Sequence, residues 1–252
     1  MSEHVDEFPD HPGVTGANER SADANQRYVK GADVKNSSDV RTHGRAVRVF
    51  FSRKTPRSLA KIAATTWLAR LVLGPPGARD LAAAVAAIAV WPLQEWVLHK
   101  HLLHLEPFTL GGTHVDPGFA RAHREHHADP RDIDKTLLPS SVVRAALPIT
   151  SAGWLLAFGP TRAALTGMAT YSTMALFYEW THFIVHTNVK PRTAYGERVR
   201  RNHRLHHFRA ESYWFAFTLP LVDRVFGTAP DPDTVARSRT AMDLHGLRTG
   251  AP

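Results

Sequence analysis

Four apolar segments, each about 16 to 19 residues long, follow one another from residue 59 onward. They cover residues 59–74, 81–98, 141–159 and 163–180, and the second contains an uninterrupted apolar run at 81–91. A helix that crosses a bilayer needs about 20 apolar residues, so these segments lie at the short end of the required length. The pattern predicts four helices, which could cross a membrane or form the core of a soluble bundle.

The loops between the segments favour the membrane. Two short turns, 74–80 and 159–162, join the segments in pairs, and if each pair is a membrane hairpin both turns lie on one side. These turns carry Arg79 and Arg162, whereas the stretches 41–61, 100–135 and 190–209 on the other side together carry 19 Lys and Arg residues. Because basic loops stay in the cytoplasm, this asymmetry predicts that both termini and the region between the hairpins are cytoplasmic. Arg70 leaves open whether 59–74 spans the membrane or lies at its interface.

The two ends of the chain lack this pattern. Residues 1–56 are rich in Ser, Asn, Asp, Arg and Gly and show neither a helical nor a strand period. We therefore predict a disordered polar tail over 1–56, an all-α integral membrane domain over 57–230, and a flexible C-terminal tail over 231–252.

Composition alone would point elsewhere. A formal charge of +8, a pI near 10.1 and a mean hydropathy of -0.26 are typical of a soluble nucleic-acid-binding protein. The apolar segments change that interpretation, because most of the basic residues become the cytoplasmic face of a membrane protein, and no nucleic-acid partner is expected. The absence of cysteine excludes disulfide scaffolds, thiolate zinc sites and cysteine-ligated iron–sulfur clusters. Any metal must then be held by histidine or carboxylate.

Histidines are abundant and clustered. Twelve of the 16 lie between residues 99 and 207, and ten of these form four clusters on the predicted cytoplasmic side. The clusters are His99 and His104; His123, His126 and His127; His182 and His186; and His203, His206 and His207. On a helix an HxxxH pair lies about 40° apart and an HxxHH triplet spans about 100°, so each can point several imidazoles at one metal. His99 and His104 are about 140° apart and need a helix end or a local distortion to converge.

Ten imidazole nitrogens are too many for one ion. Two ions with about five nitrogen ligands each would use all of them, which indicates a dinuclear centre, and neutral imidazole suits iron and zinc. His101 and His114 are weaker candidates. We interpret the four remaining histidines as incidental: His4, His11, His43 and His245.

These motifs resemble those of the fatty acid hydroxylase and sterol desaturase superfamily of membrane-bound di-iron oxygenases. The resemblance covers roughly residues 80–230 and rests on one HxxxxH and two HxxHH motifs, separated by 18 and 75 residues. The HxxxH pair at 182–186 and the ending at 221–228 are also similar to the family. The segment at 94–99 looks like the carotenoid hydroxylase branch.

The resemblance implies a helical membrane domain capped by a cytoplasmic histidine cage. It implies two iron ions, for which zinc could substitute, O2 as co-substrate, and an external electron donor such as ferredoxin with its reductase. The di-metal centre itself would hydroxylate, or with less support desaturate, an unactivated C–H bond of a lipid such as a fatty acyl chain or a sterol. A carotenoid ring is an alternative substrate. A different class, a non-catalytic membrane protein that binds or transports metal, also remains open.

Four acidic residues near the histidines are candidates for orienting the ligand imidazoles: Glu95, Glu125, Asp134 and Glu179. Carboxylates commonly accept the second ring N–H of a metal-bound histidine. Each of the four is equally explicable as an ordinary acid at a membrane interface.

Overall fold

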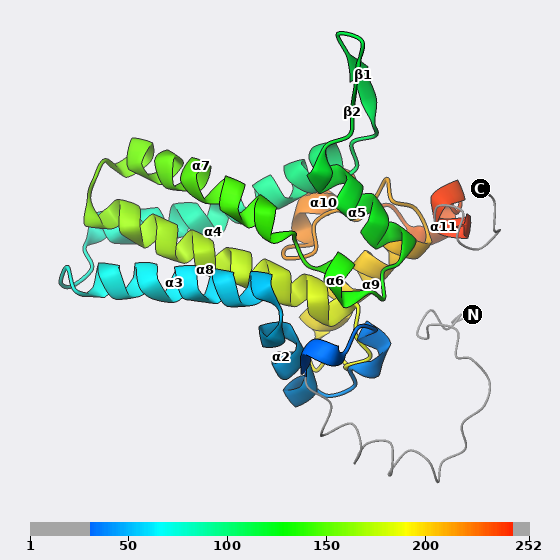
Figure 1. The fold of residues 1–252 in the computed structure, drawn as a ribbon, viewed down its shortest axis with the longest axis horizontal. Helices are drawn as coiled ribbons and strands as arrows, with labels where there is room; N and C mark the ends of the chain where they lie inside the picture. The colour runs from blue at the N-terminus through cyan, green and yellow to red at the C-terminus, as the bar shows by residue number, and fades with distance from the viewer. Residues whose placement is uncertain (1–30, 244–252) are drawn as a thin grey trace.

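The computed structural model describes residues 31–243, and this part of the chain is mostly helical (Figure 1). Four long helices lie side by side as a bundle: α3 (Lys54–Leu71), α4 (Ala78–Leu98), α7 (Ser140–Phe158) and α8 (Arg162–Val185). They correspond to the four predicted apolar segments; short turns join α3 to α4 and α7 to α8, and α3 and α4 both pack against α8. The prediction of a helical protein is confirmed for the described residues, which also contain one two-stranded antiparallel hairpin.

Helix α8 is the centre of the bundle, since it contacts α3, α4 and α7. Small side chains on α8 allow this close packing. At Gly167 a Cβ atom would lie only 2.3 Å from the Trp154 ring of α7, so a larger residue would push the two helices apart.

The outer surface of the bundle is apolar. The stretches Ala78–Leu103 and Ile133–Phe158 are long and apolar enough to cross a membrane, yet only 33% and 11% of their hydrophobic windows are buried. Helix α7 has no buried residue at all. An apolar helix in the core of a soluble protein would be covered by other elements, whereas exposed apolar helices suit a lipid surrounding.

The shorter elements gather at one end of the bundle (Figure 1). They include the π-helical turn η3 (His99–Leu103), which continues α4, and a hairpin of the antiparallel strands β1 (Phe108–Leu110) and β2 (Thr113–Val115), which pairs Phe108 with Val115. Other elements of this end are α5 (Gly118–Ala128), α6 (Ile133–Thr136), α9 (Ala194–Phe208), α10 (Leu221–Val225), η4 (Pro232–Thr234) and α11 (Arg239–Asp243).

Part of the predicted N-terminal tail is folded. Residues 1–30 lie outside the described residues, but 31–56 contain η1 (Gly31–Asp33), η2 (Ser37–Asp39), α2 (His43–Ser52) and the start of α3. Val40, Val49 and Phe50 are buried in one cluster with Ile133 and Phe183. The prediction of disorder is wrong here, because α2 is too short to show a sustained apolar period and its core partners are distant in sequence.

The predicted C-terminal tail is also partly folded. Its described residues, 231–243, contain η4 and α11, and they attach to the end of α9. Arg209 Nε donates to the Val235 carbonyl at 2.6 Å, and Ser238 N donates to the Arg209 carbonyl at 2.9 Å. Residues 244–252 lie outside the described residues.

The far end of the bundle holds a buried polar group that we name the Arg70 cluster: Arg70, Asp80 and Thr166. Arg70 Nε donates to Asp80 Oδ1 at 2.7 Å and to the Thr166 hydroxyl at 2.8 Å. The Thr166 hydroxyl donates to Asp80 Oδ1 at 2.7 Å, and Gly77 N donates to Asp80 Oδ2 at 2.8 Å. The charge that made 59–74 an uncertain segment is thus paired between α3, α4 and α8, beside the turns that end both hairpins.

Candidate metal centre

Ten histidines, which we call the histidine cage, form two groups of five at the end of the bundle opposite the Arg70 cluster. In each group the five ligand nitrogens lie within 4.8 Å of one another. The first group is His99, His104, His123, His127 and His206. The second group is His126, His182, His186, His203 and His207. These are the ten candidate ligands of the sequence, divided as the two-ion prediction requires.

Each HxxHH triplet contributes to both groups. On α5, His123 and His127 belong to the first group, and the residue between them, His126, belongs to the second. On α9 the division is reversed, since His203 and His207 belong to the second group. Residues at i and i+4 share a helix face while i+3 is displaced to one side, which lets one helix serve two neighbouring sites. The sequence alone did not indicate that each triplet contributes histidines to both groups.

The first HxxxxH pair converges through a local distortion, as the sequence analysis requires. His99 begins the π-helical turn η3, and its ring lies 5.2 Å from that of His104, centroid to centroid. In a π-helix the hydrogen bonds run from i to i+5, so residues five apart come to lie above one another. A regular α-helix would have separated these two rings.

Hydrogen bonds of two rings in the first group leave lone pairs on the converging nitrogens. His99 Nδ1 lies 2.7 Å from the Phe215 carbonyl and His206 Nδ1 lies 2.7 Å from the Tyr213 carbonyl. Because a carbonyl only accepts, these Nδ1 atoms carry the protons, and a neutral imidazole then has a lone pair at Nε2. His123 Nε2 lies 3.1 to 3.2 Å from three other Nε2 atoms, and a single N–H could not satisfy all three.

The spacing of the nitrogens also fits a bound metal. In the second group His126 and His182 approach to 3.1 Å, His203 and His207 to 3.0 Å, and His186 and His203 to 2.8 Å. Two nitrogens at right angles around an ion, each about 2.1 Å from it, would be about 3.0 Å apart. The geometry therefore matches ligands held around a common centre.

The cage keeps its imidazoles neutral, which is the form that binds metal. Burial, with the neighbouring imidazoles, lowers the pKa of the cage histidines of α5 and α9 well below the ordinary value. The cage contains no carboxylate ligand, so its chemistry suits iron or zinc and does not suit calcium or magnesium.

The rings of the second group are oriented mainly by packing. Nδ1 of His126, His203 and His207 has no hydrogen-bond partner within residues 31–243. The Phe217 ring lies 5.2 Å from that of His182 and 5.1 Å from that of His203. This aromatic contact lies between the second group and the interior of the bundle.

Two of the four candidate carboxylates act on the cage through backbone. Glu95 is buried and accepts from Phe217 N at 2.7 Å, Thr218 N at 2.9 Å and the Thr218 hydroxyl. Glu179 is buried and accepts from Leu138 N at 3.3 Å. The segment that ends at Leu138 includes Thr136, whose carbonyl accepts from His182. Each glutamate thus fixes a loop that touches the cage, and neither is hydrogen-bonded to an imidazole in the described structure.

The other two candidates lie elsewhere. Glu125 is exposed on α5. Asp134 has a side chain 61% exposed and pairs with Arg53 at 3.1 Å. The suggestion that these acids orient imidazoles is therefore wrong for both, because Glu125 is exposed to solvent and Asp134 pairs with Arg53.

Sequence reasoning missed one carboxylate. Asp223 of α10 is buried and accepts from Phe215 N at 3.0 Å and Ala216 N at 2.8 Å, so it fixes the segment whose Phe215 carbonyl orients His99. The Thr228 hydroxyl donates to the same carboxylate at 2.7 Å. The available signal was the ending at 221–228, which the family resemblance included.

Comparison with known proteins supports the interpretation of the histidine cage as a metal site. The family model described as fatty acid hydroxylase matches residues 84–228, which is more than half of the chain. The chain belongs to the fatty acid hydroxylase family. The matched region includes all ten cage histidines.

Two relatives show how far the similarity extends. The chain is 26% identical over 151 residues to dihydroceramide fatty acyl 2-hydroxylase FAH2 of Arabidopsis thaliana, covering 60% of this chain and 61% of that protein. It is 27% identical over 155 residues to fatty acid 2-hydroxylase of Rattus norvegicus, covering 57% of this chain and 38% of that protein. The match therefore spans less than two thirds of either relative.

A solved structure shares the fold. It is described as full-length scs7p with only the hydroxylase domain visible, and it matches with a TM-score of 0.61 at 21% identity. The match covers 73% of this chain and 68% of that chain. At this identity the likeness concerns the fold alone.

Proposed function

We propose that this protein is an integral membrane di-iron oxygenase that hydroxylates a C–H bond in the acyl chain of a lipid. The observation that carries the proposal is the division of ten buried imidazoles into two groups of five whose nitrogens converge. The relatives described above are named as fatty acyl hydroxylases, which favours an acyl chain over a carotenoid ring.

The ten histidines would hold two iron ions, with zinc as a substitute. When bound, such a pair supplies the two-electron chemistry of O2 that no side chain can perform. The protein's own contribution is orientation: Glu95, Asp223 and Glu179 hold the loops whose carbonyl groups and rings position the imidazoles. Buried supports of this kind keep ligands in a fixed geometry.

We also propose that α3, α4, α7 and α8 cross the membrane as two hairpins with the cage on the cytoplasmic side. The apolar outer surface of the bundle supports the crossing, and the 19 Lys and Arg residues of 41–61, 100–135 and 190–209, against two in the turns, support the orientation. Lipid would then enter laterally. Phe217 and Tyr178, whose rings lie 4.8 Å apart beneath the second group, would limit access of bulk water from the bundle side.

Electrons would come from a separate protein such as ferredoxin with its reductase. The basic cytoplasmic face would suit an acidic donor. Hydroxylation is preferred to desaturation because the relatives described above are named hydroxylases.

Isotope-labelled O2 tests the proposal. The purified iron-loaded chain would be supplied with ferredoxin, its reductase and NADPH, and with lipids carrying defined acyl chains. We expect a hydroxylated acyl lipid that contains one labelled oxygen atom, detected by mass spectrometry, and about two irons per chain. Metal flux across proteoliposomes without O2 consumption would contradict the oxygenase and favour a transport protein instead. A double bond without oxygen incorporation would overturn hydroxylation in favour of desaturation.

A further inference from the structure

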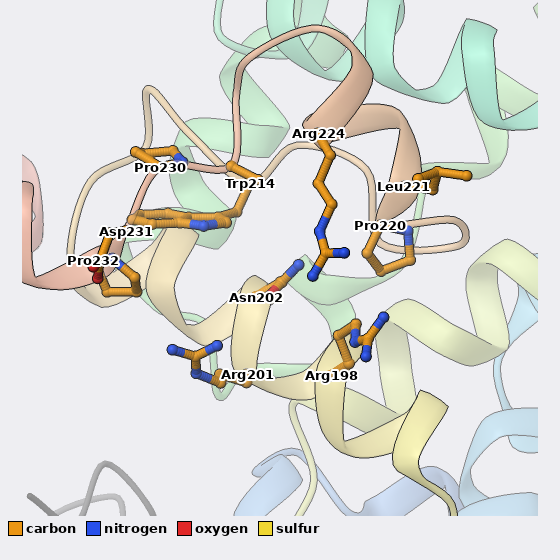
Figure 2. A pocket seen from close by; sticks show the side chains of 11 residues that line it. Arg198, Arg201, Asn202, Trp214, Pro220, Leu221, Arg224, Pro230, Asp231 and Pro232 are labelled. Atoms are coloured by element: carbon orange, nitrogen blue, oxygen red, sulfur yellow. The ribbon is translucent and has the colours of Figure 1, made fainter. Parts of the chain in front are cut away.

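A pocket of about 260 Å³ lies between α9, α10 and the loop that follows α10 (Figure 2). None of the ten cage histidines lines it. Figure 2 shows Arg224 of α10 extending toward Arg198, Arg201 and Asn202 of α9, with the Trp214 ring at the side. The pocket is thus separate from the proposed metal sites, although it shares α9 with them.

The sequence of α9 gathers positive charge on one face. Arg198, Arg201 and Asn202 are related by i, i+3 and i+4, so they are neighbours on the helix surface. Arg224 adds a third guanidinium from α10. No ion pair involves these three arginines within residues 31–243. Asp231, the one acid among the lining residues, sits in its own turn and accepts from Asp233 N at 3.1 Å.

Asn202 provides an independent sign of a ligand. The residue is only 9% exposed, no hydrogen bond to its amide is found in the described part of the chain, and its amide atoms are not among the fully enclosed ones. A nearly buried amide that lacks a partner in the chain but remains accessible can bond to water or to a ligand. The Asn202 amide lies at the wall of the pocket, where a bound group could accept its N–H.

The surroundings of the pocket indicate a lipid source for the ligand. Leu221 lines the pocket and is 56% exposed, and Val225 on the same short helix is 71% exposed. Phe226 stacks on Trp96 of α4, with ring centroids 4.4 Å apart. The pocket therefore opens beside an exposed apolar surface that is continuous with a candidate membrane span, as expected at a bilayer interface.

We propose that this pocket binds the phosphate group of an anionic membrane phospholipid. The guanidinium groups of Arg198, Arg201 and Arg224 balance its charge, and the planar guanidinium geometry suits phosphate oxygens. The Asn202 amide donates an additional hydrogen bond. Binding would anchor α9, and with it three of the cage histidines, at the membrane surface. Free phosphate has the same chemistry, and the test distinguishes the two sources.

The test measures ligand-induced stability of the full chain in detergent. The probes are inorganic phosphate, a short-chain phosphatidylglycerol and a short-chain phosphatidylcholine. At a hundredfold excess over Kd we expect phosphatidylglycerol to raise the unfolding midpoint by about 5 to 10 °C, with little effect of the other two. The triple variant Arg198→Gln, Arg201→Gln, Arg224→Gln should lose this shift. A matched control removes the same charge from three exposed arginines outside the pocket, as Arg41→Gln, Arg48→Gln, Arg57→Gln, and should keep it.

Each other outcome overturns part of the proposal. Equal protection by inorganic phosphate would replace the lipid source with a free anion. Equal protection of the wild type and the pocket variant, or loss of the shift in the control variant, would exclude the pocket as the binding site. Asn202→Leu gives a second check, because it should weaken phosphatidylglycerol binding by about tenfold without a change in charge. These measurements require no enzymatic activity, so they can fail or succeed independently of the oxygenase proposal.

Discussion

The two ends of the helix bundle both bury polar side chains, but they satisfy them in different ways. In the Arg70 cluster the guanidinium, carboxylate and hydroxyl groups bond to one another, and Arg70 Nη2 is the only cluster nitrogen without a partner in the described structure. In the histidine cage the Nε2 atoms face one another with too few protons to pair. The first end is thus nearly satisfied within the chain, whereas the second presents converging lone pairs that suit cations.

This contrast separates structural from functional burial. Both ends join helices that are distant in sequence, and both bury their polar side chains. Burial alone therefore does not distinguish them. The chemistry of the partners does: opposite charges and donors matched to acceptors make a stable internal contact, while converging lone pairs make a ligand site. The following predictions test whether the two ends are independent in this way.

The largest effect is expected from removing one cage ligand. His126→Ala and His206→Ala act on different groups, so each should lower the metal content from two ions to about one per chain. Hydroxylase activity should fall by more than about 100-fold in both, because an incomplete pair cannot share the chemistry of O2. Metal analysis and product mass spectrometry measure the two effects. His114→Ala on the exposed hairpin is the control, and a fully active double variant of His126 and His206 would refute the metal assignment.

Metal removal should affect only one end of the bundle. After chelation the cage retains buried imidazoles whose lone pairs face one another, so α5 and α9 should open more often. We expect amide hydrogen exchange in these helices to rise at least about tenfold, while the turns beside the Arg70 cluster remain unchanged. Equal loss of protection at both ends would show that the metals stabilise the whole bundle.

An intermediate effect is expected at Glu179, which supports the cage through the 136–138 loop. Glu179→Ala removes the acceptor of Leu138 N and should weaken metal binding by about 10 to 100-fold, through His182 in the second group. Competition with a chelator measures this affinity. Glu179→Gln keeps an acceptor and should recover most of the loss. Glu125→Ala is the matched control on an exposed carboxylate, and an equal effect there would contradict the role of the loop.

The sequence predicted the cage well because its signals are local. Long apolar runs define the four helices, and the spacing of the histidines on α5 and α9 defines the candidate ligands. The assignment of each histidine to one of two groups could not be predicted, since it depends on how α5 and α9 are placed between the sites. The sequence did not predict that α2 is folded, for a related reason: Phe50 packs in one cluster with residues more than 80 positions away.

The supporting carboxylates show the same limit. Glu95 and Glu125 both precede cage histidines, and only packing decides that Glu95 turns inward and Glu125 outward. Asp223 acts through the backbone at 215–216, so no side-chain motif connects it with His99. Ligands that act directly leave a pattern in the sequence, whereas residues that act through backbone leave little.

The smallest effect on the metal centre is expected from the Arg70 cluster itself. Arg70→Met removes the nearer of the two cations of buried Asp80, leaving Arg162 at 3.8 Å, and should lower the unfolding midpoint in detergent by about 10 °C. Metal content per folded chain should stay at its wild-type value, because no cage residue touches the cluster. The double variant Arg70→Met, Asp80→Leu replaces the pair with apolar groups and should recover most of the stability, since a buried pair often contributes little beyond a well-packed apolar contact. Arg79→Met, in the first turn of α4 next to Asp80 but exposed, is the control for loss of charge. If metal is lost from the folded single variant, the two ends are coupled through α4 and α8, and the separation of structural from functional burial fails.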